Sequence, residues 1–343
     1  MTIRWALIGT GRVHRAMAPA IRAAAGTRLV AVLSRDQQRA AAFAEQFGIA
    51  HAHDSLQSLL ANPEVDVVYV ASPNGLHVAH AVAAAQAGKH VFCEKPLALS
   101  LDGCRDIRSA CRAHGVQLGL GVMFRQHPAH RMARALVADG ALGDVVQAQI
   151  RLGVAWRDRQ PDWYADTALA GAGVLYMAGV HRIDLLRFVL GSEVREVSAM
   201  VGEHTPARPW DEWATALLRF DNGVRASMDL DIRLPNGNSD LEIHGTRGSL
   251  VVTGSTTSWW GGGGSELLLK TGAATERHQF DQIDLYRSQV EDFNRAIAEG
   301  GEPAGDGHDG QACAQVCLAM LESSRSGRTL RLNAVDAPGA GWH

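Results

Sequence analysis

The chain has 343 residues, of which 46% are hydrophobic and 20% are charged, and its formal net charge is -3 at pH 7. This length predicts about two globular domains. The charges form no basic block and no acidic tail, which argues against binding to nucleic acid or to an anionic membrane. The N-terminal residues lack a basic segment followed by a long apolar run, so we expect neither a signal peptide nor a membrane span.

Cysteine and histidine patterns predict neither a disulfide framework nor a metal site. The five cysteines are odd in number and show no C-x-x-C spacing. We expect them to be small, buried thiols in a reduced, cytoplasmic protein. The 15 histidines form neither an H-E-x-x-H nor an H-x-x-E-H pattern, so no metal is expected. The cysteines are Cys93, Cys104, Cys111, Cys313 and Cys317.

The chain begins with a short apolar run at 3–8, followed by Gly9-Thr10-Gly11 and a helical pattern over 13–25. A strand, a glycine turn and a helix in this order are typical of a dinucleotide-binding unit, whose turn approaches the pyrophosphate at the helix N-terminus. His14 stands where a third glycine is usual, and an ordinary strand–helix turn is the alternative. The expected nucleotide contacts are Gly9, Thr10, Gly11, Arg12 and Val13.

The end of the next strand, 28–33, indicates which nucleotide is bound. It lacks the acidic residue that hydrogen-bonds both ribose hydroxyls of NAD. Ser34 can instead hydrogen-bond a 2′-phosphate, and Arg35 can pair with it and stack on adenine. Asp36 lies one position later, and we expect it to cap the helix 38–47. The sequence therefore favours NADP(H), with NAD(H) as the second choice and a solvated Arg35 as the alternative interpretation.

Strands and helices then alternate with short connections, which predicts a doubly wound parallel sheet. The run 65–71 is almost continuously apolar, as in a parallel strand buried on both faces, and it ends at Ser72-Pro73-Asn74. The run 88–93 ends at Glu94-Lys95-Pro96. Ligands of such sheets lie beyond the carboxyl ends of the strands, so both segments are expected to line the cofactor site. Helices are expected at 76–86 and 100–114, and a further strand is expected at 116–122.

Lys95 and His77 are candidate site residues within these segments. Lys95 follows an apolar strand and is fixed by Pro96. A desolvated ammonium at this place can hydrogen-bond a substrate oxygen and stabilise developing alkoxide charge, whereas most lysines are solvated surface charges. His77 is either a structural group at a helix end or a residue that lines the pocket.

The second half carries a series of β-like runs between helices. Asn222-Gly223 is a strong hairpin signal between two of these runs. The glycine-rich stretch 259–264 is expected to be a flexible loop. Helices are expected at 129–138, 284–299 and 310–325, and strands at 145–152, 194–201, 213–220, 224–232, 241–243, 250–253 and 267–270.

The segment 171–184 joins the turn Gly171-Ala172-Gly173 to a helical stretch that carries His181 among apolar and small residues. A histidine in an apolar helix is often a buried core group. The glycines around His181 favour a functional role instead. An imidazole suits proton transfer because its unperturbed pKa lies near 6.5.

Together these motifs resemble the Gfo/Idh/MocA family of oxidoreductases, which includes glucose–fructose oxidoreductase and inositol dehydrogenase. The resemblance rests on Gly9-Thr10-Gly11, Ser72-Pro73-Asn74 with His77, Glu94-Lys95-Pro96 and the stretch 171–184. It implies an α/β fold: an N-terminal Rossmann domain, 1–122, and a C-terminal domain, 123–343, with a large, mainly antiparallel sheet. That sheet commonly mediates homodimers or homotetramers.

The resemblance also implies roles for individual residues. Lys95 would hydrogen-bond the reacting oxygen and His181 would exchange its proton beside the nicotinamide C4, while the cofactor supplies the hydride. The inositol dehydrogenase pattern has an aspartate where this chain has Met177, which cannot accept a proton. Either Lys95 and His181 work alone, assisted by Tyr176 or a substrate hydroxyl, or the protein binds the nucleotide for another purpose. Asp184 is expected to support the orientation of His181.

Other candidate residues for the substrate site come before and within this segment. Aromatic residues ahead of 171–184 can form a lid over a sugar ring or can simply anchor a loop. The full set of substrate candidates is Arg125, Trp156, Arg157, Asp158, Trp163, Tyr164, Tyr176, Met177 and Asp184.

The expected function is hydride transfer between NADP(H) and a carbonyl or secondary alcohol of a sugar, polyol or related keto compound. One alternative is a hydrolase or lyase that retains NAD and oxidises its substrate transiently, which retained nucleotide would reveal. Another is a non-catalytic nucleotide-sensing regulator. The presence of both Lys95 and His181 argues against this second alternative, and Met177 is the feature in its favour.

Overall fold

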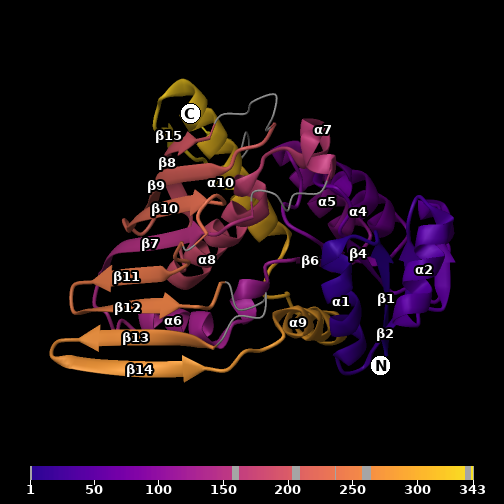
Figure 1. Ribbon diagram of the computed structural model, residues 1–343, viewed down its shortest axis with the longest axis horizontal. Coiled ribbons are helices and arrows are strands. Elements are labelled where there is room, and N and C mark those ends of the chain that lie inside the picture. The colour runs from indigo at the N-terminus through magenta and orange to yellow at the C-terminus, as the bar shows by residue number, and fades with distance from the viewer. Residues whose placement is uncertain are drawn as a thin grey trace. The chain divides into compact units, whose positions relative to one another are not determined.

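The structure, a computed structural model, describes residues 2–156, 162–202, 209–235, 237–256, 264–336 and 341–342. Its contacts divide the chain into two compact units (Figure 1). The first comprises residues 1–123 and 284–311, and the second comprises residues 124–283 and 312–343. Each unit contains its own sheet, so the expected α/β class with one parallel and one mainly antiparallel sheet is confirmed.

The first unit is built on a six-stranded parallel sheet in the order β3-β2-β1-β4-β5-β6. This is the doubly wound order of dinucleotide-binding sheets, which places the switch point between β1 and β4. The strands are β1 (Ile3–Ile8), β2 (Thr27–Leu33), β3 (His51–His53), β4 (Val67–Val70), β5 (His90–Cys93) and β6 (Leu118–Leu120). The helices are α1 (Arg12–Ala23), α2 (Gln37–Phe47), α3 (Leu56–Leu60), α4 (His77–Gln86) and α5 (Leu101–Ala113), with the 3-10 turn η1 (Asn74–Leu76).

A helix from late in the chain completes the core of the first unit. Helix α9 (Leu285–Glu299) packs against α1. Its Phe293 ring lies 5.8 Å from Trp5 and 5.1 Å from Phe92, and the Trp5 Nε1–H donates to Asn294 Oδ1 at 3.0 Å. The expected C-terminal domain, 123–343, included this helix. The structure places it in the first unit because its apolar face completes the aromatic core there.

The second unit is built on a nine-stranded sheet in the order β14-β13-β12-β11-β7-β10-β9-β8-β15. All neighbouring pairs are antiparallel except β10 and β7. The strands are β7 (Val145–Gly153), β8 (Val194–Val201), β9 (Trp213–Phe220), β10 (Arg225–Asp231), β11 (Leu241–Gly245), β12 (Gly248–Thr253), β13 (Ser265–Thr271), β14 (Ala274–Phe280) and β15 (Leu330–Arg331).

Helices cover one face of the nine-stranded sheet. Helix α6 (Pro128–Ala138) contacts β12 and β13, while α8 (Val180–Leu190) contacts β7 and α6. The last long helix is α10 (Gly307–Ser326). On β9 every second residue is buried, as expected for a strand with one face in the core. The remaining short elements are η2 (Met123–Gln126), η3 (Asp162–Ala165), α7 (Thr167–Ala170) and η4 (Leu175–Gly179).

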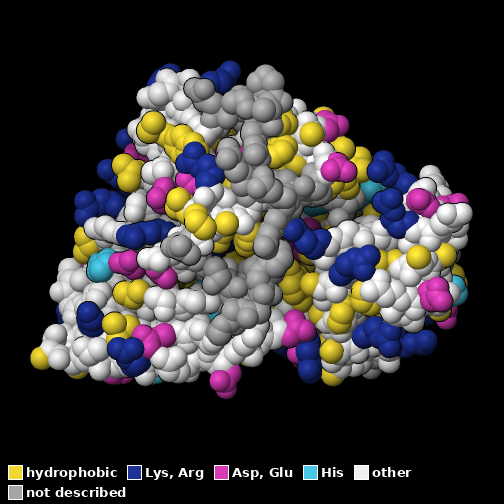
Figure 2. Space-filling view, viewed as in Figure 1, with side chains coloured by type: hydrophobic (Ala, Val, Ile, Leu, Met, Phe, Trp, Pro, Cys, Tyr) yellow, Lys and Arg dark blue, Asp and Glu magenta, His cyan; other side chains and the backbone are white. Residues whose placement is uncertain are grey.

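One described stretch, Thr167–Leu190, is long and apolar enough to cross a membrane by length and composition alone. In this structure 83% of its most apolar window is buried inside the protein, as in a core helix. Positive and negative side chains are interspersed over the face shown in Figure 2. The expected loop at 259–264 lies outside the described residues except for Gly264.

Candidate functional site

The glycine turn after β1 has the backbone geometry of a pyrophosphate-binding turn. Gly9 adopts φ +118°, and a Cβ there would lie 2.5 Å from the His14 ring. Gly11 is the N-cap residue of α1 and has no side chain that could cover the first backbone N–H groups of this helix. These N–H groups, with the helix dipole behind them, fit the negative pyrophosphate of a dinucleotide.

His14 takes the place of the usual third glycine and packs over Gly9. Its Nε2 lies 2.9 Å from the Ile8 carbonyl oxygen, and the residue is 1% exposed. Burial lowers the pKa of His14 to about 4. The ring is therefore neutral at pH 7, and its Nε2–H donates to Ile8. His14 thus stabilises the turn by packing, without adding a charge to it.

The residues that follow β2 are a serine, an arginine and an aspartate that caps the next helix. The carboxylate of Asp36 caps α2 by accepting from the Arg39 N–H at 3.1 Å, which confirms the expected cap. Ser34 is half-buried and Arg35 is exposed. Neither residue is acidic, so this strand end offers a hydroxyl and a guanidinium rather than a carboxylate.

His77 connects the turns that follow β4 and β5. Its Nδ1 lies 2.8 Å from the Pro96 carbonyl oxygen and its Nε2 lies 2.9 Å from the Ser72 carbonyl oxygen. Burial lowers the pKa of His77 to about 4, although both carbonyls act in the opposite direction. A neutral ring has one N–H and donates to one carbonyl at a time. His77 therefore links the Ser72-Pro73-Asn74 and Glu94-Lys95-Pro96 segments to each other.

Glu94 is enclosed at the end of β5, directly before Lys95. The Tyr69 hydroxyl donates to Glu94 Oε1 at 2.7 Å, and the Lys95 backbone N–H lies 3.3 Å from Oε2. A Cβ on Gly121 would lie 2.8 Å from Oε1, so only glycine leaves room for the carboxylate. Burial raises the pKa of Glu94, and the Lys95 charge opposes this shift. The half-buried Lys95 side chain follows this anchored carboxylate.

In the second unit, one buried carboxylate organises the turn that precedes α8. Asp211 accepts from the backbone N–H groups of Gly173 at 2.6 Å and Leu175 at 3.0 Å. The chain then forms η4, a single π-helical turn, and passes into α8. A Cβ on Gly173 would collide with the Asp211 backbone. The glycines of this segment thus allow the close approach of Asp211.

His181 lies in the first turn of α8 and is 7% exposed. Its ring packs against Phe124, with centroids 5.1 Å apart. Met177 is the one partly exposed residue within η4, whose other residues are buried. Tyr176 is 2% exposed, so it belongs to the packed interior of this unit.

Arg125 and Asp184 are brought together as a buried ion pair. Arg125 Nη2 lies 2.6 Å and Nε 2.9–3.0 Å from the Asp184 carboxylate oxygens. Arg187 Nη1 lies 3.8 Å from Asp184, and its Nη2 contacts Glu193 at 2.5 Å. This network fixes α8 against the segment that carries Arg125. In this structure, the Asp184 carboxylate is thus the ion-pair partner of Arg125.

The aromatic candidates ahead of α7 form a small cluster. The Trp163 and Tyr164 rings lie 4.4 Å apart, and Trp210 lies 6.5 Å from Tyr164. Trp156 is half-buried at the end of the described segment. Arg157 and Asp158 lie outside the described residues.

One cluster of acidic residues and a histidine, within the described part of the chain, has a structural explanation. Asp306, His308 and Asp309 lie close enough to share an ion, yet Asp306 and Asp309 accept from each other's backbone N–H at 2.9 and 3.3 Å, as a reciprocal cap of α10.

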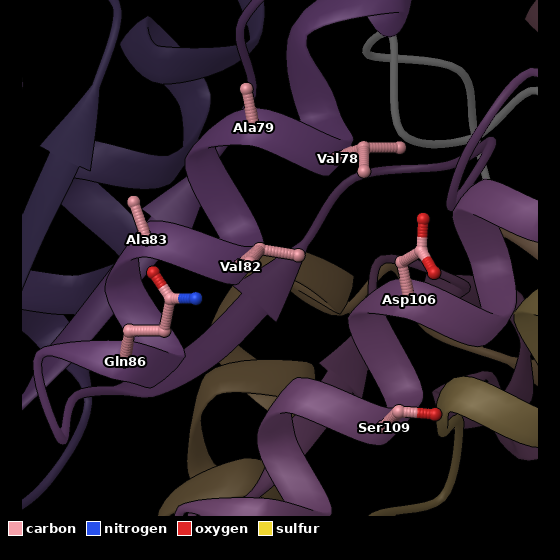
Figure 3. A pocket seen from close by; sticks show the side chains of 7 residues that line it. All are labelled: Val78, Ala79, Val82, Ala83, Gln86, Asp106 and Ser109. Carbon is pink, nitrogen blue, oxygen red and sulfur yellow. The ribbon is translucent and has the colours of Figure 1, made fainter.

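An open hollow of about 420 Å³ lies between α4 and α5 (Figure 3). Helical side chains line it, and none follows the end of a strand: Val78, Ala79, Val82, Ala83, Gln86, Asp106 and Ser109.

Four residues that the sequence did not single out are central to these sites. Tyr69 lies inside an apolar strand, and Phe124, Arg182 and Asp211 hold contacts with partners far away in the chain. Of these four residues, only Asp211 could have been noticed in the sequence, as an acidic residue directly ahead of a strand-like run. The roles of the other three depend on tertiary packing.

Comparisons with known proteins agree with these features. Residues 3–122 match the GFO_IDH_MocA model, described as an oxidoreductase family with an NAD-binding Rossmann fold, and residues 130–251 match the GFO/IDH/MocA C-terminal domain. The chain is 31% identical to 1,5-anhydro-D-fructose reductase of Ensifer adhaerens, covering 96% of this chain and 98% of the relative. It is 30% identical to D-xylose 1-dehydrogenase (NADP(+)) 2 of Haloferax volcanii, covering 95% and 99%.

Solved structures show the same fold over nearly the whole chain. Aldose–aldose oxidoreductase from Caulobacter crescentus, complexed with glycerol, superposes with a TM-score of 0.88 at 27% identity, covering 97% of this chain and 100% of that one. Levoglucosan dehydrogenase in complex with NADH and levoglucosan gives a TM-score of 0.87 at 25% identity, covering 96% and 99%. The glycine turn, the Glu-Lys-Pro segment and the histidine of α8 thus belong to an enzyme of the Gfo/Idh/MocA family of NAD-binding oxidoreductases.

Proposed function

We propose that this enzyme transfers hydride between NADP(H) and a carbonyl or secondary alcohol of a sugar, polyol or related keto compound. The substrate class is supported by relatives named for 1,5-anhydro-D-fructose, D-xylose and levoglucosan. The observation that carries the oxidoreductase proposal is the glycine turn at Gly9 and Gly11 in front of the N-terminus of α1, which fits a dinucleotide pyrophosphate.

The preference for NADP(H) is supported by the residues after β2. Ser34 and Arg35 offer a hydroxyl and a cation, while the carboxylate of Asp36 is engaged in capping α2. One relative is named as NADP(+)-dependent, whereas a similar structure contains NADH. We therefore expect the cofactor preference to depend on Arg35.

In the proposed reaction, Lys95 and His181 act on the substrate oxygen. The bound nicotinamide would supply or accept the hydride. The Lys95 ammonium donates a hydrogen bond to this oxygen and stabilises its negative charge. The His181 imidazole takes the hydroxyl proton during oxidation and returns it during reduction. The Tyr69–Glu94 hydrogen bond supports this role by holding the segment from which Lys95 projects.

We also propose that the nine-stranded sheet mediates a homodimer or homotetramer. Met200 pairs with Thr215 across β8 and β9, so both lie on the same face of the sheet as Leu217. Met200 is 67% and Leu217 is 65% exposed. A neighbouring subunit would cover these apolar side chains.

Substituting the two proposed catalytic residues tests the reaction. We expect Lys95→Ala and His181→Ala each to lower turnover by at least about 100-fold, the usual contribution of a positioned acid–base group. Both variants should still bind NADPH, measured by fluorescence titration. Lys89→Ala is the matched control, since Lys89 precedes β5 whereas Lys95 follows it. Full activity in either of the first two variants would disprove the mechanism.

Arg35→Ala tests the cofactor assignment separately. Loss of a charge-assisted contact to the 2′-phosphate should raise the Kd for NADPH by about 10- to 100-fold and leave that for NADH nearly unchanged. Arg39→Ala, which removes an exposed arginine from the first turn of α2, is the control. Equal effects of Arg35→Ala on both nucleotides would remove the assignment.

A further inference from the structure

Arg182 is a buried arginine that follows His181 in α8. It is 2% exposed, and its guanidinium carbon lies 5.4 Å from the Phe124 ring centroid. His181 packs on the same phenyl ring, at 5.1 Å between centroids. The guanidinium thus contacts the same phenyl ring as the imidazole that we propose to transfer the proton.

The hydrogen-bonding capacity of Arg182 is largely unused within the described part of the chain. A guanidinium has five N–H donors. Among the described residues, Arg182 donates to the Ser239 hydroxyl, with Nη2 and Oγ 3.3 Å apart, and its Nε has no acceptor. Burial lowers the pKa of Arg182 to about 9, with no described carboxylate to offset it. The side chain still carries its charge at pH 7.

Two other buried arginines of the same unit show how this chain stabilises such a group. Arg125 holds Asp184 through two of its nitrogens, and Arg187 holds Glu193 in the same way. Both lie within the helix-packing network around α8. Arg182 differs from them because no carboxylate of the described residues pairs with it. A buried cation without an anion is unfavourable, which points to a partner other than these residues.

The two histidines packed beside the Phe124 ring are neutral. The Ala129 N–H donates to His127 Nδ1, so the ring proton of His127 is on Nε2. His130 Nδ1 lies 2.8 Å from the Phe124 carbonyl oxygen, so its Nε2 accepts from the Ser255 hydroxyl at 2.8 Å. Burial lowers the pKa of His127 to about 4 and that of His130 to about 3. Arg182 is thus the source of positive charge in this cluster.

We propose that Arg182, with the Ser239 hydroxyl beside it, binds a carboxylate or phosphate group carried by the substrate. The Ser239 and Thr256 hydroxyls contact each other, so the guanidinium adjoins a small polar surface that can rearrange around an anion. This inference rests on the proposed function and narrows it. The preferred substrates are acidic sugar or polyol derivatives, whose charged group is held next to the residue that moves the proton.

Matched neutral and acidic substrates test this assignment. We would measure kcat/KM for a hexose, the corresponding hexuronate and the hexose 6-phosphate, with both nucleotides. We expect the wild type to prefer at least one acidic member. Arg182→Gln should lower the ratio of acidic to neutral kcat/KM by about 100-fold, as for a lost charge-assisted pair, and Arg182→Lys should lower it less. Arg134→Gln, an exposed arginine of α6 that stacks on Phe188, is the charge-matched control.

An unchanged ratio in a folded Arg182→Gln variant would overturn the proposal while leaving the oxidoreductase function intact. If the variant does not fold, a thermal-shift titration of the wild-type protein tests the proposal instead. The acidic sugar should raise Tm saturably, and the neutral sugar should not. Equal stabilisation by inorganic sulfate or phosphate would indicate a site for free anions and overturn the substrate assignment. If no sugar is turned over, the proposed function fails, and the same thermal shift still tests the site.

Discussion

Met177 stands where a carboxylate could assist the proposed proton transfer by His181. It lies four positions before the histidine and is the partly exposed member of a buried π-helical turn. A thioether accepts only weak hydrogen bonds and carries no charge. In the proposed reaction, His181 would therefore act without a carboxylate at position 177, with its ring packed on Phe124.

Restoring a carboxylate tests this interpretation. In Met177→Asp, the negative charge should favour the protonated imidazole, so the acidic limb of the kcat/KM profile for alcohol oxidation moves to higher pH by about one unit. Met177→Asn, which has a similar shape and no charge, separates the charge from the change in size. Superimposable pH profiles for the Asp and Asn variants would show that position 177 does not act on the histidine.

Single residues could be predicted from the sequence where their role is local. Asp36 caps the helix that follows it, and the five cysteines are buried, as expected. The Arg125–Asp184 pair joins residues 59 positions apart, and no local pattern indicates it. For the same reason, the buried charge of Arg182 is visible only in the folded chain.

At the scale of elements, the segment 171–190 shows what the sequence could and could not predict. Its glycine turn and helix were expected, but the π-helical turn η4 and its carboxylate anchor were not. Strands with alternating apolar residues were found at or near their expected places, such as β9 and β10. Strand β14 was missed because nearly all of its side chains are polar and exposed at the edge of the sheet.

Asp211 should be a principal determinant of the stability of this element. Asp211→Ala leaves two buried N–H groups, of Gly173 and Leu175, without their acceptor, so we expect a loss of about 2–4 kcal/mol in the free energy of unfolding. Urea titration of the variant and the wild type measures this loss. Asp229→Ala removes an exposed carboxylate that accepts from Thr215 and should cost less than about 0.5 kcal/mol. Similar losses in the two variants would contradict the anchoring role.

Over the whole molecule, each unit includes a segment from late in the chain: residues 284–311 in the first unit and residues 312–343 in the second. Helix α9 supplies Phe293 and Asn294 to the core around Trp5. Periodicity predicts this helix, yet its partner depends on which apolar faces are left uncovered after both sheets form. The sequence therefore predicts the sheets better than it predicts the boundary between the units.

Buried neutral histidines in both units make the stability of the protein depend on pH. Burial lowers the pKa values of four of them, to about 4 for three and about 3 for the fourth: His14, His77, His127 and His130. In the unfolded chain these rings take up protons near pH 6.5. The unfolded state thus binds more protons between about pH 6.5 and 4, and the folded state loses stability as the pH falls through this window.

Each of these histidines should contribute roughly 2 kcal/mol of destabilisation at pH 5 relative to pH 7.5. Since a folded domain is stable by only about 5–15 kcal/mol, we expect Tm to fall steeply over this range. His130→Gln should flatten the dependence, because one proton-binding site disappears from the unfolded chain, even if the variant is less stable at pH 7.5. His114→Gln, on the exposed end of α5, should leave the dependence unchanged. A flat Tm between pH 7.5 and 5 in the wild type would show that the folded and unfolded protein take up the same number of protons over this range, and would contradict the lowered pKa values of these rings.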